Sequence, residues 1–133
     1  MKDKLVRDVM QFGVPACGIA TPLTDIARML SAEAREILVV MDEKCVQGVV
    51  SQSDLARAFL GDFESMTAKD IMSPGMFSIA PDISLGVAVE TMIEKGFHQL
   101  LVMPDTDDCA APLGVLSKRH VVELMAEQLE VAR

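Results

Sequence analysis

The sequence predicts an α/β fold in which a βαββα unit occurs twice. The first observation is an internal repeat. VRDVM at 6–10 matches AKDIM at 68–72, and ILVVM at 37–41 matches QLLVM at 99–103. The second is a pair of short apolar runs in each copy, and the third is an amphipathic segment ahead of each pair. Together they indicate a duplicated layer of sheet and helices.

Each repeat opens with a short helical turn and a brief extended piece, and an amphipathic helix follows. In the first copy Thr24 is placed to cap a helix that carries Ile26 and Leu30 at helical spacing. In the second copy Ser84 is the expected cap and Gly96 the expected C-terminal stop. We therefore expect an amphipathic helix at this place in each repeat.

Two apolar runs then follow in each copy, and they are too short for helices. The four runs are 37–41, 46–50, 99–103 and 113–116. Continuous β-prone runs of this length are typical of buried strands. Closing helices are expected at 54–60 and from 118 to about 129.

A three-stranded sheet with two helices on one face leaves its other face apolar and uncovered. We therefore expect the repeats, at 1–62 and 63–133, to pack as an intimate pair related by a pseudo-twofold axis.

Composition and charge narrow the class of protein. The chain has 133 residues, half of them apolar, and no run approaches the roughly 20 apolar residues of a membrane span. Charges at the N-terminus interrupt any signal-peptide core, so we expect a cytoplasmic protein. The net charge of −8 disfavours nucleic acid and anionic membranes as partners.

The residues that commonly carry chemistry are few and scattered. Cys17, Cys45 and Cys109 form no CxxC pair, which argues against a disulfide framework and against zinc. Neither His98 nor His120 has a nucleophile at catalytic spacing, and the dinucleotide, P-loop and HExxH motifs are absent. We therefore expect half-buried free thiols, no metal, no catalytic residue and no enzymatic activity.

The turn that joins the second apolar run to the closing helix carries the most specific pattern. Ser51 ends a strand and Asp54 lies on the first helical turn, and the second copy has Ser117 and His120 at these positions. A carboxylate there can accept hydrogen bonds from both ribose hydroxyls, while the serine suits a phosphate. The same spacing also describes a capping box, which the residues alone favour.

The ordered motifs resemble a tandem pair of CBS (cystathionine β-synthase) domains, a Bateman module, over nearly the whole chain. The matching segments are DVM at 8–10, DIM at 70–72, LVV at 38–40, LLV at 100–102, and GVVS at 48–51 followed by Asp54 and Leu55. The resemblance implies a non-enzymatic regulatory module that binds an adenosine-containing ligand between the repeats. AMP, ADP, ATP, S-adenosylmethionine and, in some members, NAD are such ligands.

The resemblance also implies roles for individual residues. Asp54 would hold the ribose, and Ser51 would lie beside the phosphate. The facing wall would come from the second repeat, through Ser73, Met76, Phe77, Phe97, His98 and Gln99, with Lys118 and Arg119 within reach of a phosphate. Ordinary packing is the alternative for Met76 and Phe97, and solvated surface charge is the alternative for the two basic residues.

This chain departs from the family pattern in ways that bear on function. The proline common in the middle strand is Val39 in one copy and Leu101 in the other, and His120 replaces the usual second acid. We therefore expect the mirror site to be empty or weaker. A homodimer and a separate, unidentified effector protein are implied, and the acidic chain favours a ligand with few phosphates, or S-adenosylmethionine, over ATP. The alternative is a ligand-free dimerisation or scaffold module.

Overall fold

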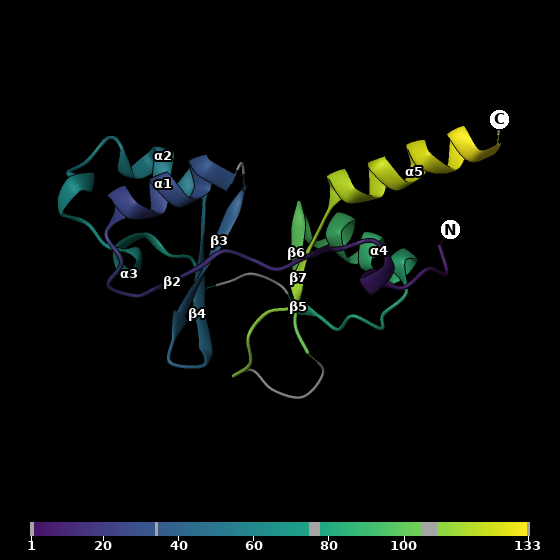
Figure 1. The fold of residues 1–133 in the computed structure, drawn as a ribbon, viewed down its shortest axis with the longest axis horizontal. Coiled ribbons are helices and arrows are strands. Elements are labelled where there is room, and N and C mark those ends of the chain that lie inside the picture. Colours follow the sequence, from purple (N-terminus) through teal and green to yellow (C-terminus); the bar gives the residue numbers. More distant parts are fainter. Residues whose placement is uncertain (1, 34, 75–77, 105–108, 133) are drawn as a thin grey trace. The chain divides into compact units, whose positions relative to one another are not determined.

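The helices and strands gather in two units, each built on its own sheet (Figure 1). The computed structural model describes the whole chain except residues 1, 34, 75–77, 105–108 and 133. Unit 1 comprises Met1–Gly13, Phe77–Asp107 and Pro112–Arg133, and unit 2 comprises Val14–Met76 and Asp108–Ala111.

Unit 2 holds a three-stranded sheet in the order β2-β3-β4. Its elements are β2 (Ala16–Gly18), α1 (Leu23–Glu33), β3 (Ile37–Asp42), β4 (Cys45–Ser51), α2 (Gln52–Ala58), the 3-10 helix η2 (Phe63–Ser65) and α3 (Ala68–Ile71). β2 runs parallel to β3 and β4 runs antiparallel to it, with a bulge between Val40 and Met41. α1 and α2 pack on one face of this sheet (Figure 1).

Unit 1 repeats this plan and adds one edge strand. Its elements are the 3-10 helix η1 (Val6–Asp8), β1 (Gln11–Phe12), β5 (Ser78–Ile79), α4 (Leu85–Lys95), β6 (Gln99–Val102), β7 (Gly114–Ser117) and α5 (Lys118–Ala132). The sheet order is β1-β7-β6-β5, with β5 parallel to β6 and the other two pairs antiparallel. The α/β class and the repeated βαββα order are therefore confirmed.

Each unit has its own apolar core, formed where the helices meet alternate residues of the strands. In unit 2 the buried set is Leu23, Ile26, Leu30, Leu38, Val40, Val50, Ala58 and Ala68. In unit 1 it is Val6, Met10, Leu85, Ala88, Met92, Leu100, Val102 and Leu116. Burying one such aliphatic side chain stabilises the fold by about 1.5–3 kcal/mol, so the strands are anchored chiefly by these faces.

The helix ends test the capping predictions. Ser84 caps α4, because its side chain accepts a hydrogen bond from the Val87 N–H at 3.3 Å, and Gly96 ends that helix with φ 72°. Both predictions are confirmed. The prediction for Thr24 is wrong, since Thr24 lies inside α1, and the first helical N–H group, that of Leu23, donates to the Met66 carbonyl at 3.1 Å.

The compact units do not coincide with the sequence repeats. The first 13 residues of the chain belong to unit 1, together with most of the second repeat, while α3 belongs to unit 2. Each unit therefore combines the opening segment of one repeat with the sheet and helices of the other. The boundary at residue 62 concerns the repeat in the sequence and stays a prediction.

A disulfide joins Cys45 to Cys109, with the two Cα atoms 4.0 Å apart. The prediction of three separate thiols is therefore wrong, and Cys17 alone is a free cysteine among the described residues. The disulfide could not be predicted from the spacing of the cysteines, because Cys45 and Cys109 lie 64 residues apart and meet only in the folded chain. Within the described ranges, no helix is long and apolar enough to cross a membrane.

Candidate functional site

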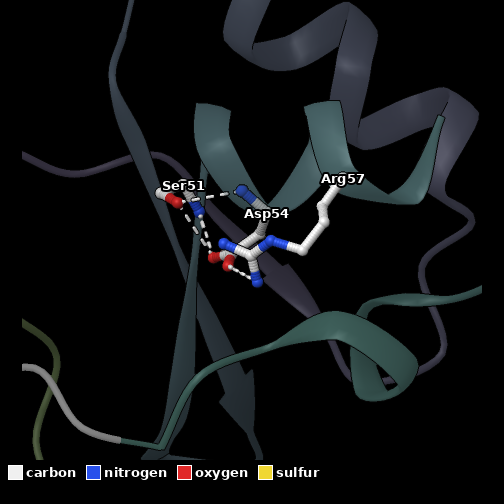
Figure 2. Close-up of polar contacts among 3 residues, drawn as sticks. All are labelled: Ser51, Asp54 and Arg57. Carbon is white, nitrogen blue, oxygen red and sulfur yellow. Dashed lines mark hydrogen bonds and ion pairs between the residues drawn. The ribbon is translucent and has the colours of Figure 1, made fainter. Parts of the chain in front are cut away.

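The turn from β4 into α2 is held by a reciprocal pair of hydrogen bonds (Figure 2). The Asp54 carboxylate oxygen Oδ2 accepts from the Ser51 backbone N–H at 2.9 Å and from its hydroxyl at 3.0 Å. In return, the Ser51 hydroxyl oxygen accepts from the Asp54 N–H at 3.1 Å. Ser51 keeps extended backbone angles, so the chain leaves the strand and enters the helix at this residue. The capping-box interpretation is therefore confirmed.

Asp54 is also a buried carboxylate, with only 8% of its surface exposed. Its second oxygen, Oδ1, lies 3.8 Å from the Arg57 guanidinium (Figure 2), whose side chain is 74% exposed. Burying a carboxylate costs free energy unless charge and hydrogen bonds compensate it. Here Ser51 engages one oxygen, and a solvated guanidinium faces the other.

A cavity of about 300 Å³ adjoins this carboxylate within unit 2. It is lined by Asp54, Arg57, Ala58, Met66, Asp70 and Ile71. Asp70 repeats the capping arrangement, since its Oδ2 accepts from the Thr67 N–H at 2.8 Å. The cavity wall thus carries two carboxylates, one guanidinium and apolar side chains, which together can hold a small molecule that has hydroxyl and anionic groups.

The structure brings one further predicted residue beside this turn. Ser73 pairs with Val49 of β4, accepting from its N–H at 3.0 Å and donating to its carbonyl at 2.9 Å. Val49 lies two residues before Ser51, so the opening loop of the second repeat runs along the same strand end. The ligand role of Ser73 stays a prediction.

Unit 1 contains the equivalent turn with an imidazole in place of the carboxylate. The His120 Nδ1 atom accepts from the Ser117 N–H at 3.0 Å, and the Ser117 hydroxyl accepts from the His120 N–H at 3.3 Å. Gln11 pairs with Val115 of β7 as Ser73 does with Val49. His120 is half-buried, and its side chain caps the helix in place of the missing acid.

The remaining predicted site residues lie in unit 1 or outside the described residues. Phe97 packs against the unit 1 core, the His98 carbonyl accepts from the Lys118 N–H at 3.1 Å, and Gln99 pairs with Ser117. Lys118 is exposed, and Arg119 lies 3.7 Å from Glu123 on the surface of α5. Met76 and Phe77 fall outside the described residues. The ligand roles of all these residues stay predictions.

Five residues of the cavity lining were absent from the predicted site, namely Arg57, Ala58, Met66, Asp70 and Ile71. Arg57 had a usable signal, because a residue three positions after Asp54 on a helix shares its face. Met66 and Asp70 carried no such signal, since their approach to α2 depends on how the second repeat begins. Among the described residues, no group of three or more metal-binding side chains occurs.

A second feature is an apolar surface on unit 1, formed by α4 and α5. A groove of about 360 Å³ runs between these helices, lined by Lys2, Leu85, Gly86, Val89, Glu90, Val121, Leu124 and Met125. Val87, Ile93, Val122, Met125 and Leu129 are each more than half exposed. We call these five residues the α4–α5 surface.

Comparison with known proteins places these features in a family. The model of the CBS domain matches the chain twice, at residues 6–61 and 68–127. A curated relative, described as a probable arabinose 5-phosphate isomerase of Haemophilus influenzae, is 28% identical over 103 residues, which cover 75% of this chain and 31% of that protein. The chain thus spans about a third of this relative.

Solved structures agree on the fold. A conserved protein of Pyrococcus horikoshii matches with a TM-score of 0.81 at 17% identity, over 94% of each chain. The CBS domain pair of protein MJ0100, in complex with 5'-methylthioadenosine and S-adenosyl-L-methionine, matches with a TM-score of 0.79 at 17% identity, over 94% of this chain and 98% of that one. The chain belongs to the CBS domain family and carries two copies of the domain.

Proposed function

We propose that this chain is a regulatory module that binds an adenosine-containing ligand at the Ser51–Asp54 turn and transmits binding as a conformational change. The observation that carries the proposal is the buried Asp54 carboxylate beside a cavity of about 300 Å³. A carboxylate in this position can accept hydrogen bonds from a ribose diol. The CBS domain pair of protein MJ0100, which shares the fold, binds two adenosine derivatives.

Further ligand contacts are proposed for residues of the second repeat. Phe97 and Gln99 would contact the adenine, and Lys118 and Arg119 would contact an anionic group of the ligand. Signalling requires that the ligand bind one conformation of the module more tightly than another, and this difference in affinity is the free energy available for it. A separate effector protein would read that change in the cytoplasm. The module itself performs no reaction under this proposal.

Titration calorimetry tests the proposal with AMP, ADP, ATP, S-adenosylmethionine and NAD. We expect at least one of them to bind, and Asp54→Asn to weaken it by about tenfold or more, which corresponds to about 1.4 kcal/mol. The amide keeps an oxygen for capping but removes the charge that receives the ribose. Asp8→Asn is the matched control, because Asp8 caps the Leu5 N–H at 3.0 Å and is exposed.

Three results would count against parts of this proposal. Absence of binding by every ligand excludes the sensor. Unchanged affinity in Asp54→Asn moves the ligand away from this turn. Conversion of a bound ligand on long incubation shows an enzyme.

The alternative function is a ligand-free dimerisation or scaffold module, and the α4–α5 surface favours it. Within this surface, Val122, Met125 and Leu129 are each more than half exposed and share one side of α5. Exposed apolar side chains that lie together in this way are typical of protein interfaces. The basic residues Lys118 and Arg119 begin α5, and Glu123 and Glu127 follow, so two antiparallel copies of α5 would set opposite charges against each other. A concentration-dependent dimer that Val122→Glu disrupts, together with no ligand binding, would support this alternative.

A further inference from the structure

We propose that Arg57 is a specificity-determining residue, which makes the Ser51–Asp54 site prefer adenosine ligands with a phosphate over those with a sulfonium. The inference rests on the proposed function and names the ligand class of the same site. It starts from the cavity of unit 2, where Arg57 is the basic residue of the lining and two aspartates are its acids.

The contact between Arg57 and Asp54 is loose. The guanidinium nitrogen lies 3.8 Å from Asp54 Oδ1, beyond hydrogen-bond distance, and the Arg57 side chain is 74% exposed. On α1, by contrast, Arg28 and Asp25 form a hydrogen-bonded pair at 2.9 Å with the same spacing in the sequence. Because solvent screens the Arg57 pair, turning its guanidinium toward a ligand costs little.

Among the described residues that line the cavity of unit 2, Arg57 is the one cation. Without Arg57 the wall would present the carboxylates of Asp54 and Asp70 and no cation. Two carboxylates attract a sulfonium or an ammonium group and repel a phosphate. A guanidinium reverses that preference, because its planar array of donors matches a phosphate with two parallel hydrogen bonds.

The spacing along α2 suits a nucleotide. Residues three apart on a helix share a face and are separated by about 4.5 Å along the helix axis. That separation is comparable to the distance between the ribose diol and the 5'-phosphate of a mononucleotide. Asp54 can therefore hold the diol while Arg57, one turn further along, meets the phosphate.

The competing interpretation is that Arg57 only balances the charge of Asp54 as a surface ion pair. Both interpretations predict a weak contact in the free protein, but they differ in how ligands of different charge respond to its removal. A simple ion pair affects all ligands of Asp54 alike. A phosphate-binding residue affects AMP and leaves neutral adenosine almost unchanged.

Calorimetry at about 0.15 M salt, where exposed charges are screened beyond about 8 Å, separates the two interpretations. The ligands are AMP, adenosine and S-adenosylmethionine, and the proteins are the wild type, Arg57→Gln, Arg57→Lys and Arg28→Gln. Arg28→Gln is the matched control, because it removes the same charge from an exposed pair with the same spacing in unit 2.

We expect the wild type to bind AMP about tenfold more tightly than adenosine, a difference that one charge-assisted hydrogen-bonding group can supply. Arg57→Gln should lose most of this ratio and bind S-adenosylmethionine at least as well as the wild type. Arg57→Lys should recover part of the ratio, and Arg28→Gln should keep all of it.

Three outcomes overturn the inference, and they are distinguishable. An unchanged ratio of AMP to adenosine affinity in Arg57→Gln assigns the phosphate to another residue and leaves the proposed function standing. An equal loss in Arg28→Gln assigns the effect to net charge. Absence of binding by all three ligands to the wild type removes the proposed function, and the inference falls with it.

Discussion

At the scale of single residues, burial distinguishes Asp54 from the other capping side chains. Asp8, Asp54, Asp70 and His120 all receive a backbone N–H from the residue three positions earlier. The carboxylates of Asp8 and Asp70 are exposed, whereas Asp54 is the one buried acid among the described residues. Capping needs no burial, so the desolvation cost at Asp54 is consistent with a further role for its charge.

His120 offers a gain-of-function prediction at the same scale. Its Nδ1 accepts the Ser117 N–H at 3.0 Å, as Asp54 Oδ2 accepts the Ser51 N–H at 2.9 Å, so an aspartate at position 120 can take over the capping bond. The change His120→Asp would then place a carboxylate at the second site. We expect the calorimetric stoichiometry of an adenosine ligand to rise from one to two per chain. A stoichiometry that stays at one would show that the acid alone does not complete the second site.

The sequence located this site only in part, because capping and ligand binding use the same atoms. The spacing of Ser51 and Asp54 is local, so it predicted their contact. It could not separate the two roles, since burial of Asp54 depends on how α3 and the segment before it approach α2. The position of Arg57 beside Asp54 could have been predicted, because residues three apart on a helix lie on the same face.

At the scale of elements, close approach of a backbone explains the glycines of β4 and β7. A Cβ atom added at Gly48 would lie 2.7 Å from the Ser73 carbonyl oxygen, and one at Gly114 would overlap the backbone of Gln11. Both glycines therefore stand where the opening segment of the other repeat crosses a strand. The absence of a side chain at these two glycines lets β1 pair with β7 and lets Ser73 pair with Val49 of β4.

Gly48→Ala should destabilise unit 2, because its new methyl group meets backbone that cannot move away as a flexible side chain does. We expect a loss of about 1–3 kcal/mol in the free energy of unfolding, the usual cost of forcing extra volume into a packed site. Urea unfolding measures it. Gly18→Ala in β2 is the control, since its Cβ would meet only Thr21 at 3.8 Å. Equal stability of the two variants would contradict the packing argument.

The elements that the sequence predicted are those with a periodic signal. The runs that became β3, β4, β6 and β7 are long enough and apolar enough to be recognised before the fold is known. β1 and the Ser73 bridge could not be found in this way, because two residues carry no period and their partners lie far along the chain. Thr24 was misplaced because α1 begins one residue earlier, at Leu23, whose N–H donates to the carbonyl of Met66, far along the chain.

At the scale of the whole molecule, the chain crosses from one unit to the other more often than the two repeats require. Residues 1–13 belong to unit 1 although they begin the first repeat, and 108–111 belong to unit 2 although both flanking segments belong to unit 1. The second of these crossings carries Cys109, which is bonded to Cys45 at the start of β4. Both cysteines of the disulfide therefore lie in unit 2.

The chemistry of the three cysteines makes this bond measurable. Burial raises the pKa of the Cys17 thiol above its ordinary value, against the opposing effect of its hydrogen bond with Thr21. A raised thiol pKa leaves less thiolate, so Cys17 should react slowly in the folded protein. Oxidised, unfolded protein should therefore show one thiol, and reduced protein should show three.

Reduction should lower the stability of the folded chain. The bond closes a loop with a sequence separation of 64, and such a cross-link stabilises a fold by about 2–4 kcal/mol, chiefly by restricting the unfolded chain. We expect urea unfolding with and without dithiothreitol to differ by this amount in the wild type. Cys45→Ser should abolish the difference and Cys17→Ser should preserve it, because only the first removes the bond. Three reactive thiols in the oxidised, unfolded wild type, or a reduction-sensitive Cys45→Ser variant, would show that the pairing of Cys45 with Cys109 does not form in solution.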